Sequence, residues 1–508
     1  MSQNDHVSAA ATLEYLAETA RTSIQAGRLD TAASIYENMV SMAPADPAIR
    51  HTLGLVYLEQ GRTDKALFHI GRSIELNSSN SAAYRSMADA LAASGQFSLA
   101  IRAYRKACGL DPRNTDALLN LGSIFHQLDM LEQARRTFME IISQAPHHRR
   151  ALNNLGKVYH DSGQLRRALD CYDRCIDLHP DYAEARFNRA ILLLALGEFK
   201  QGWQEYEWRF KRSGAANVYP HRLSMPRWRG ETYRGRCLLV HCEQGMGDVL
   251  QFVRYLPMVK ERGGRLLMEA HAPLVPLLKT LPWIDEVIAF NEDRAPDHPH
   301  DLRISLLSLP GIFDTRLDTI PRKIPYIEIA PAAADVWKDH LKADGINVGL
   351  VWASSDLNPK RDLPIHQCAS WLQNPRLKFI GLQKGSASGQ LSHLGTKKSS
   401  AIELGPLLNN FFDTAAVMLG LDLVISVDTA AAHLAGALGK RLWVLLPYSA
   451  DWRWPLNGED PPWYPGARIF RQPSAGSWDT VILSVAEELQ KLATAFQGNR
   501  SASTDSKA

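Results

Sequence analysis

Ala117-Leu-Leu-Asn-Leu-Gly122 and Ala151-Leu-Asn-Asn-Leu-Gly156 are similar hexapeptides that lie 34 residues apart. The same period runs through the first two fifths of the chain, where a small residue recurs at Ala20, Gly54, Ala88, Gly122, Gly156 and Ala190. A second small position recurs at Ala32, Ala66, Ala100, Ala134, Ala168 and Gly202, and a bulky position follows it at Tyr36, Ile70, Tyr104, Phe138, Tyr172 and Tyr206. Small residues let paired helices approach closely, and bulky side chains fill the groove between them. The period predicts a solenoid of stacked helical pairs, with six units between residues 13 and 216.

This pattern resembles the tetratricopeptide repeat. Glycines such as Gly61 fall between the two helices of a unit, and prolines such as Pro112 fall between units, where they end a helix. The resemblance implies a curved superhelix whose extended concave wall holds a partner protein.

Composition is that of an ordinary globular protein of two or three domains, with 508 residues, 45% hydrophobic and 22% charged. A net charge of +3 indicates no nucleic-acid partner, and no apolar run is long enough to span a membrane. Residues 1–12 form a short N-terminal segment without a secretory signal, so we expect a cytoplasmic protein. The six cysteines show no C-x-x-C pair and indicate reduced thiols rather than structural zinc. Residues 497–508 are small and polar and are predicted to be a disordered tail.

The pattern changes to alternating strands and helices after a linker at 217–235. A first α/β lobe is predicted at 236–325, an interlobe linker at 326–345 and a second α/β lobe at 346–496. Apolar runs predict the strands of both lobes, at 237–241, 265–269, 287–290, 302–307, 346–353, 378–383, 421–428 and 441–447. Continuous apolar strands are expected in a parallel sheet covered by helices on both faces. A ligand is therefore expected between the lobes, at the carboxyl ends of the strands.

Several motifs of this region resemble the bacterial repeat-bearing glycosyltransferases. They are Glu243-Gln-Gly-Met-Gly-Asp248, Gly349-Leu-Val-Trp-Ala353, Leu382-Gln-Lys-Gly385, Ser426-Val-Asp-Thr-Ala-Ala-Ala-His-Leu-Ala-Gly-Ala-Leu-Gly-Lys440 and Asp451-Trp-Arg-Trp454. The region is similar to glycosyltransferase family 9, the heptosyltransferases. That resemblance implies a GT-B fold of two Rossmann-like lobes, with the acceptor on the first lobe and the nucleotide-sugar on the second. The fusion to repeats also resembles the O-linked N-acetylglucosamine transferases and the flagellin glycosyltransferases.

The turn from Asp428 to His433 is the predicted site of the donor diphosphate. Free amides of Thr429, Ala430 and Ala431 at a helix N-terminus attract an anion, and their small side chains let it approach. The resemblance assigns this turn, with His433, to the donor pyrophosphate. The alternative is that Asp428 is the N-cap of an ordinary α/β helix.

Asp248 is the predicted catalytic residue, and Gly245 and Gly247 of the same turn are predicted to contribute to donor binding. In heptosyltransferases the matching aspartate is the proposed general base, which takes the proton of the acceptor hydroxyl as that oxygen attacks the sugar. Its place at a helix N-terminus is expected to lower its pKa. The alternative is again an N-cap, and His241, Glu243 and His433 are the other candidates for the base.

Cations are needed to neutralise the departing nucleoside diphosphate, and no D-x-D tripeptide indicates a metal site. Lys384, which fits the family pattern best, and the pair Lys360 and Arg361 follow predicted strands and are assigned this role, although each could be a solvated loop cation. Neither a metal nor another cofactor is expected. The glycine-rich loop of the family is replaced here by residues 354–359, of which only Ser354 is carried over.

Asn120, Asn154 and Asn188 are also 34 residues apart, each two positions before a small packing residue. Two helical steps rotate a side chain by about 200°, so these amides are expected to point away from the packed face. Such a row could bind peptide backbone, as the resemblance to O-linked N-acetylglucosamine transferases implies. Solvated surface asparagines are the alternative.

Together these features predict a metal-independent, inverting glycosyltransferase that moves a sugar from a nucleotide-sugar to an acceptor protein held by the repeats. Serine or threonine of flagellin or another surface protein is the favoured acceptor. Transfer to a polysaccharide or lipid-linked glycan, and a non-catalytic repeat scaffold with a degenerate transferase lobe, stay open, as does a homo-oligomer.

Overall fold

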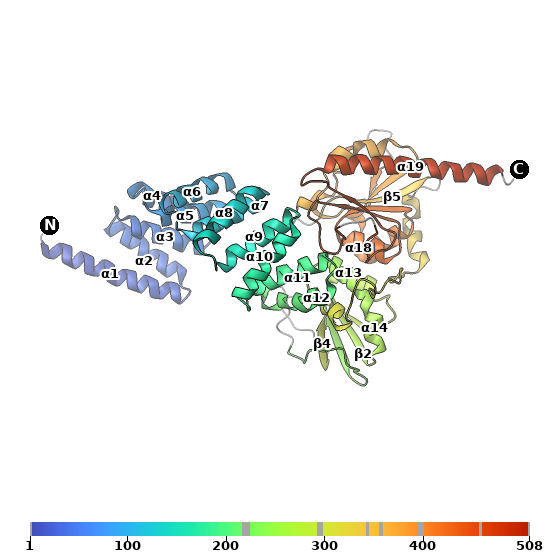
Figure 1. The fold of residues 1–508 in the computed structure, drawn as a ribbon, viewed down its shortest axis with the longest axis horizontal. Coiled ribbons are helices and arrows are strands. Elements are labelled where there is room, and N and C mark those ends of the chain that lie inside the picture. Colours follow the sequence, from blue (N-terminus) through green and yellow to red (C-terminus); the bar gives the residue numbers. More distant parts are fainter. Residues whose placement is uncertain are drawn as a thin grey trace. The chain divides into compact units, whose positions relative to one another are not determined.

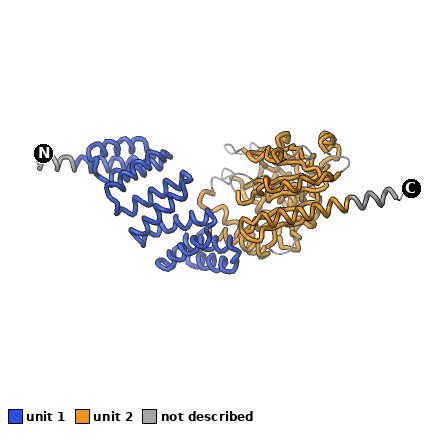
Figure 2. Tube along the Cα trace, turned by 90° about the horizontal axis from the view of Figure 1, so that it is seen from above, with its two compact units in different colours: residues 1–182 blue, residues 183–508 orange. Residues whose placement is uncertain are grey.

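The computed structural model describes residues 3–215, 224–291, 298–341, 345–354, 359–394, 401–456 and 460–505. The chain divides into two compact units, residues 1–182 and 183–508, which Figure 2 shows in different colours. The predicted linkers at 217–235 and 326–345, and the loop at 354–359, lie partly outside the described residues.

The first unit is a run of antiparallel helical pairs, which forms the tetratricopeptide superhelix (Figure 1). Its helices are α1 (Gln3–Gln25), α2 (Leu29–Met42), α3 (Pro47–Glu59), α4 (Thr63–Leu76), α5 (Ser81–Ala93), α6 (Phe97–Leu110), α7 (Thr115–Gln127), α8 (Leu131–Gln144), α9 (Arg149–Asp161) and α10 (Leu165–Leu178). Four of the described N-caps follow the 34-residue period and accept hydrogen bonds from backbone N–H groups of the first turn, namely Asp46, Asn80, Asn114 and His148. Each cap satisfies a donor that has no partner within the helix, and this fixes where each pair begins.

Small and bulky positions of the repeat pack against each other, as the sequence predicts. A methyl group at Gly54 would lie 2.5 Å from Ile70 Cγ1, one at Gly122 would lie 2.7 Å from Phe138 Cε1, and one at Gly156 would lie 2.5 Å from Tyr172 Cε1. These approaches are closer than a Cβ atom tolerates. Glycine is therefore required there by the depth of the packing between the helices of a pair.

The sixth helical pair belongs to the second unit. It consists of α11 (Ala183–Ala195) and α12 (Phe199–Tyr206), and a short 3-10 helix, η1 (Glu207–Lys211), follows it. Side chains of this pair, including Phe199, Trp203 and Tyr206, join the apolar core of the α/β region. The repeats were predicted to end as a domain at 216, whereas the division of the chain falls one helical pair earlier.

The first parallel sheet has the strand order β3-β2-β1-β4, from β1 (Cys237–His241), β2 (Arg265–Ala270), β3 (Glu286–Ala289) and β4 (Leu302–Ser305). The strands β1, β2 and β3 follow one another toward one edge of the sheet, and β4 then lies on the other side of β1. Helical segments that accompany it are α13 (Met246–Phe252), η3 (Val253–Tyr255), α14 (Leu256–Glu261), η4 (Ala272–Leu274), α15 (Val275–Leu278), η5 (Leu306–Ser308) and α16 (Leu309–Ile312).

The second parallel sheet has the order β10-β9-β8-β5-β6-β7, which is that of doubly wound nucleotide-binding sheets. Its strands are β5 (Ile346–Val351), β6 (Leu377–Gly381), β7 (Ala401–Glu403), β8 (Leu423–Val427), β9 (Leu442–Leu446) and β10 (Arg468–Arg471). The α-helices beside it are α17 (Phe411–Leu419), α18 (Ala430–Ala437) and α19 (Trp478–Asp505). The 3-10 segments are η6 (Pro331–His340), η7 (Pro359–Arg361), η8 (Ile365–Gln373), η9 (Gly385–Ala387), η10 (Ser392–Leu394) and η11 (Gly405–Leu407). Residues of α19 and α18 pack into different apolar clusters, which cover the two faces of this sheet.

Both ends of the described chain are helical. α1 begins at Gln3 and occupies most of the predicted 1–12 segment, and α19 continues to Asp505, through most of the predicted disordered tail. A helix that is already nucleated adds a hydrogen bond for each further residue, which favours such extensions. No helix in the described part of the chain is long and apolar enough to cross a membrane.

Candidate functional site

Asp248 lies in the first turn of α13, directly after the turn that leaves β1. Its Oδ2 accepts a hydrogen bond from the backbone N–H of Gly245 at 2.9 Å, and Gly245 is the N-cap of α13. Its Oδ1 accepts from Nη2 of Arg453, which belongs to the second lobe. Asp248 is therefore not the N-cap itself: from the third position of α13 it accepts from the backbone of the N-cap residue, with one carboxylate oxygen.

Arg453 joins the two lobes through Asp248 and Gln251 and is also held by Asp451 of its own lobe. Nε donates to Oε1 of Gln251 at 2.7 Å, and Nη1 donates to Oδ1 of Asp451 at 2.7 Å. The guanidinium stands 4.4 Å from the ring centroid of Trp452 and is 7% exposed. Because it is buried and its donors are engaged on three sides, Arg453 fixes the position of Asp248 against the second lobe.

Burial raises the pKa of Asp248, and the charge of Arg453 only partly offsets this. The sequence led us to expect a lowered pKa from the helix N-terminus, and this expectation is wrong. The helix has only two turns and its positive end acts on a carboxyl that has lost most of its water, so desolvation dominates.

Asp428 follows β8 and faces the same cluster. Its Oδ1 accepts from Nε1 of Trp454 at 2.8 Å, and its Oδ2 lies 3.1 Å from Nη1 of Arg361. Burial raises the pKa of this carboxyl, while Arg361 and the indole N–H act in the opposite direction. Asp451, 3.9 Å from Arg361, differs because burial is outweighed by Arg453 and Arg361, so that its pKa is lowered.

The N-terminus of α18 is not capped by a side chain. Thr429 is the N-cap residue, and its hydroxyl lies 3.0 Å from Oγ of Ser426 rather than on the first turn. Ala430 and Ala431 therefore begin the helix without side-chain partners for their amides. The N-cap interpretation of Asp428 is wrong, because its carboxylate is turned to Arg361 and Trp454.

The first turns of α13 and α18 meet at Gly247. A methyl group on Gly247 would lie 2.9 Å from Cδ2 of His433 and 3.4 Å from Cα of Ala430. Gly247 is therefore needed for contact between the lobes. The two helix N-termini, one with Asp248 and one with uncapped amides, lie side by side for this reason.

His433 is a buried, neutral residue. Burial lowers its pKa to about 3. Nδ1 lies 2.8 Å from the hydroxyl of Tyr464, and the ring stacks on Trp454 with centroids 5.7 Å apart. The ring of His433 thus packs in the core behind the turn from Asp428 to Ala431, where its contacts are with Tyr464 and Trp454.

The remaining residues predicted to bind the donor differ in their partners. Arg361 reaches Asp428, whereas the ammonium of Lys384 donates to the backbone carbonyl of Leu408. Ser354 donates through its hydroxyl and its N–H to Oδ1 of Asp362, which holds the end of β5. Lys360 is exposed.

Glu243, one of the other candidates for the base, is paired with Arg209. It is 2% exposed and forms a two-pronged ion pair with Arg209 at 2.7 and 2.9 Å. Ser305 also donates to it. His241 is buried within β1. These contacts give Glu243 a structural role.

The asparagine row is divided between the units. Asn120 on α7 and Asn154 on α9 are half-buried, and Asn120 Nδ2 donates to Oδ1 of Asp89 at 2.9 Å. Asn153 Nδ2 donates to Oδ1 of Asn154 at 3.3 Å. Asn188 lies on α11 of the second unit. Asn120 and Asn154 are therefore oriented by neighbouring side chains rather than freely solvated.

Sequence reasoning missed the residues that connect the cluster, above all Arg453 and Asp451. The sequence shows them only within the resemblance motif Asp451-Trp-Arg-Trp454, because nothing in the spacing shows that Arg453 meets Asp248. Among the described residues, no group of three or more His, Cys, Asp or Glu side chains is arranged to hold a metal ion.

Comparison with known proteins identifies the repeats. Residues 23–90 match a family model described as tetratricopeptide repeat, and residues 88–129 match one described as TPR repeat. Further tetratricopeptide-repeat models match residues 116–148, 150–182 and 171–204. Repeats of this kind generally provide a surface that binds partner proteins.

Similar whole proteins cover the chain in part. Protein FlbA of Caulobacter vibrioides is 32% identical over 341 residues, which are 62% of this chain and 56% of FlbA. BBSome complex member BBS4 of Bos taurus is 27% identical over 121 residues, which are 24% of this chain and 23% of BBS4. The chain thus spans little more than half of FlbA and about a quarter of BBS4.

Two solved structures match parts of the chain. YrrB, described as a TPR protein with an unusual peptide-binding site, is 22% identical and covers 34% of this chain and 88% of its own, with a TM-score of 0.30. PilF of Pseudomonas aeruginosa is 23% identical and covers 34% and 79%, with a TM-score of 0.31.

Proposed function

We propose that the chain is a GT-B glycosyltransferase that transfers a sugar from a nucleotide-sugar to an acceptor protein. The observation that carries this proposal is the meeting of Asp248 with the uncapped N-terminus of α18 across the two lobes. A base for the acceptor hydroxyl and a seat for the donor diphosphate would then lie next to each other. The resemblance to heptosyltransferases assigns the same two roles.

The opposite pKa shifts of two aspartates in the cluster support a division of roles. Asp451 has a lowered pKa and serves as a permanent counter-ion to Arg453 and Arg361. Asp248 has a raised pKa, which makes its carboxylate a better proton acceptor than an ordinary aspartate. A carboxylate has about four lone-pair sites. Two are used by Gly245 and Arg453, so others remain for the acceptor hydroxyl.

The donor diphosphate would be held by the amides of Thr429, Ala430 and Ala431 and by Arg361. Arg361 is 30% exposed and already lies at this turn, so it can exchange Asp428 for a phosphate oxygen. Lys384 would have to leave the carbonyl of Leu408 to contribute. The acceptor would be a serine or threonine of a protein held by the repeats, with flagellin as the first candidate.

The test compares donor binding with transfer in the full chain. Thermal unfolding is measured with UDP-, GDP-, ADP- and CMP-sugars, and we expect one class to raise the melting temperature by mass action. Asp248→Asn should keep that rise but lower transfer of labelled sugar to protein by about 10²–10⁴-fold. Asp318→Asn, an exposed acid outside the cluster, is the matched control and should leave both unchanged.

A non-catalytic scaffold is the second candidate, and one observation favours it. Arg453 forms ion pairs with both Asp248 and Asp451, as expected of an interface whose role is only to hold two lobes together. The scaffold proposal is preferred to the enzyme proposal if no nucleotide-sugar raises the melting temperature and the only effect of Asp248→Asn is a loss of stability.

A further inference from the structure

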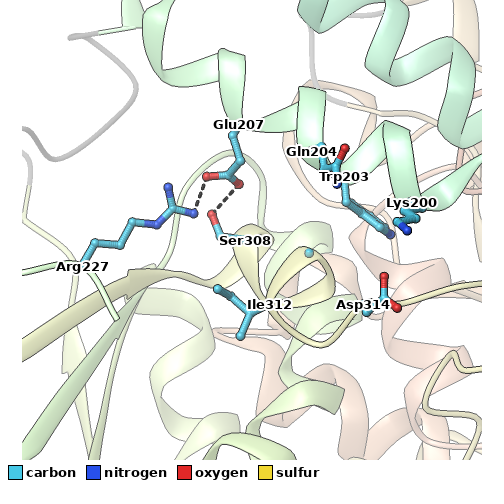
Figure 3. A pocket seen from close by; sticks show the side chains of 9 residues that line it. Lys200, Trp203, Gln204, Glu207, Arg227, Ser308, Ile312 and Asp314 are labelled. Carbon is cyan, nitrogen blue, oxygen red and sulfur yellow. Dashed lines mark hydrogen bonds and ion pairs between the residues drawn. The ribbon is translucent and has the colours of Figure 1, made fainter. Parts of the chain in front are cut away.

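A separate pocket of about 230 Å³ lies within the second unit, beside α12 and the η5–α16 segment. Figure 3 shows two sets of polar groups around it. Lys200, the indole nitrogen of Trp203 and Asp314 gather on one side, while Glu207, Arg227 and Ser308 form a bonded group on the other. The pocket contains none of the residues assigned above to the donor or to proton transfer.

Trp203 is the unusual member of this lining. It is 4% exposed, and in the described part of the chain its Nε1–H has no hydrogen-bond partner although it lines the pocket. Leaving a buried donor unsatisfied is destabilising, because the group has lost its hydrogen bond to water and gained none in return. A group that brings an oxygen acceptor to this nitrogen would recover that cost.

The charges of the lining balance. Lys200 and Arg227 are cations, and Glu207 and Asp314 are anions. Glu207 is held by Arg227, Arg209 and Ser308, whereas among the described residues Asp314 pairs with the exposed Arg316 at 2.6 Å. An exposed pair of this kind is weak, so Asp314 is available as an acceptor.

We propose that this pocket binds one neutral sugar residue. A sugar hydroxyl both accepts and donates. It can therefore accept from Trp203 Nε1 or Lys200 and donate to Asp314, while sugar C–H groups contact Ile312. Because the two anions of the lining offset its two cations, a neutral ligand suits the pocket better than a carboxylate. The volume is below the 300–1,000 Å³ of drug-sized sites, which suits a monosaccharide and excludes a nucleotide-sugar. The proposal does not depend on transferase activity.

The experiment is saturation-transfer NMR and calorimetry on the full chain, with glucose, mannose and N-acetylglucosamine as probes and glucuronate as the charged comparison. Trp203→Phe removes the N–H and should weaken binding of the preferred neutral sugar by about 5–10-fold. Gly311→Ala is the second variant. Its methyl group would lie 3.5 Å from Trp203 Cβ, an ordinary contact, so the fold is retained while the pocket narrows.

Gly109→Ala is the matched control, because a methyl group there meets nothing within 4 Å and lies in the other unit. We expect it to bind the sugar as the wild type does and Gly311→Ala to bind it at least several-fold more weakly. The proposal is overturned if no neutral sugar binds at millimolar concentration, if glucuronate binds more tightly than glucose, or if Gly311→Ala leaves binding unchanged.

Discussion

Three carboxyl groups of the candidate site differ in the direction of their pKa shifts because their partners differ. Asp451 has two arginines within 4 Å, whereas Asp248 and Asp428 each have one within that distance. Burial therefore prevails at Asp248 and Asp428, and the arginines prevail at Asp451. The sequence identified Asp248 and Asp428 from their turns, but the direction of the Asp248 pKa depends on burial, which no local motif reports.

His433 makes stability depend on pH. Its pKa is about 3 in the folded chain and about 6.5 in the unfolded chain, so the unfolded chain binds the proton first as the pH falls. The contribution of the neutral His433 ring to the free energy of unfolding is present above pH 6.5 and is lost progressively as the pH falls toward 3. Between pH 7 and pH 5 we expect the free energy of unfolding to drop by about 2 kcal/mol from this residue alone.

The measurement is urea unfolding across this pH range for the wild type and for His433→Gln, which keeps a polar side chain but cannot titrate. The two pH profiles should converge as the pH falls from 7 to 5. His271, which is half-buried and lies on a loop, provides the matched substitution, and His271→Gln should leave the profile of the wild type unchanged. Parallel profiles for the wild type and His433→Gln would show that the buried ring does not resist protonation.

Elements with strong periodicity were predictable, and short exposed ones were not. The strands β5, β8 and β9 are buried throughout, so they appear in the sequence as uninterrupted apolar runs. The edge strands β7 and β10 are three and four residues long and mostly half-buried, and sequence reasoning missed both. An edge strand lacks a second neighbour and needs no continuous apolar run.

The packing of a repeat predicts the effect of adding one methyl group. Gly122→Ala places its Cβ atom 2.7 Å from Cε1 of Phe138, whose ring is fully buried and cannot move away. We expect a loss of about 1–3 kcal/mol in the free energy of unfolding of the first unit, measured by urea denaturation followed by circular dichroism.

Gly109→Ala is the control for this prediction as well. It lies in α6 with open space around it, so alanine should leave stability unchanged or raise it by up to about 1 kcal/mol. Equal effects of the two substitutions would show that the small position is not set by the depth of packing between the helices.

For the whole molecule, the 34-residue period predicted where the repeats end but not which core the last pair joins. α11 and α12 carry the repeat pattern, yet Trp203 packs edge-on against Phe252 and Trp452 of the α/β region. Arg209, just after α12, is fully buried and supplies the ion-pair partner of Glu243. A period shows that helices pair with each other, but only the fold shows that the last pair also covers the α/β lobes.

This arrangement predicts which truncation folds. A fragment of residues 183–508 keeps the aromatic contacts of α12 and the pair of Arg209 with Glu243, and we expect it to be soluble with a cooperative thermal transition. A fragment of residues 217–508 exposes Phe252 and Trp452 and leaves Glu243 buried without its cation, which costs about 3–5 kcal/mol. It should aggregate or show no near-ultraviolet circular dichroism. If it unfolds at the same temperature as 183–508, the sixth pair is only an appendage of the repeats, and the division of the chain belongs at residue 216.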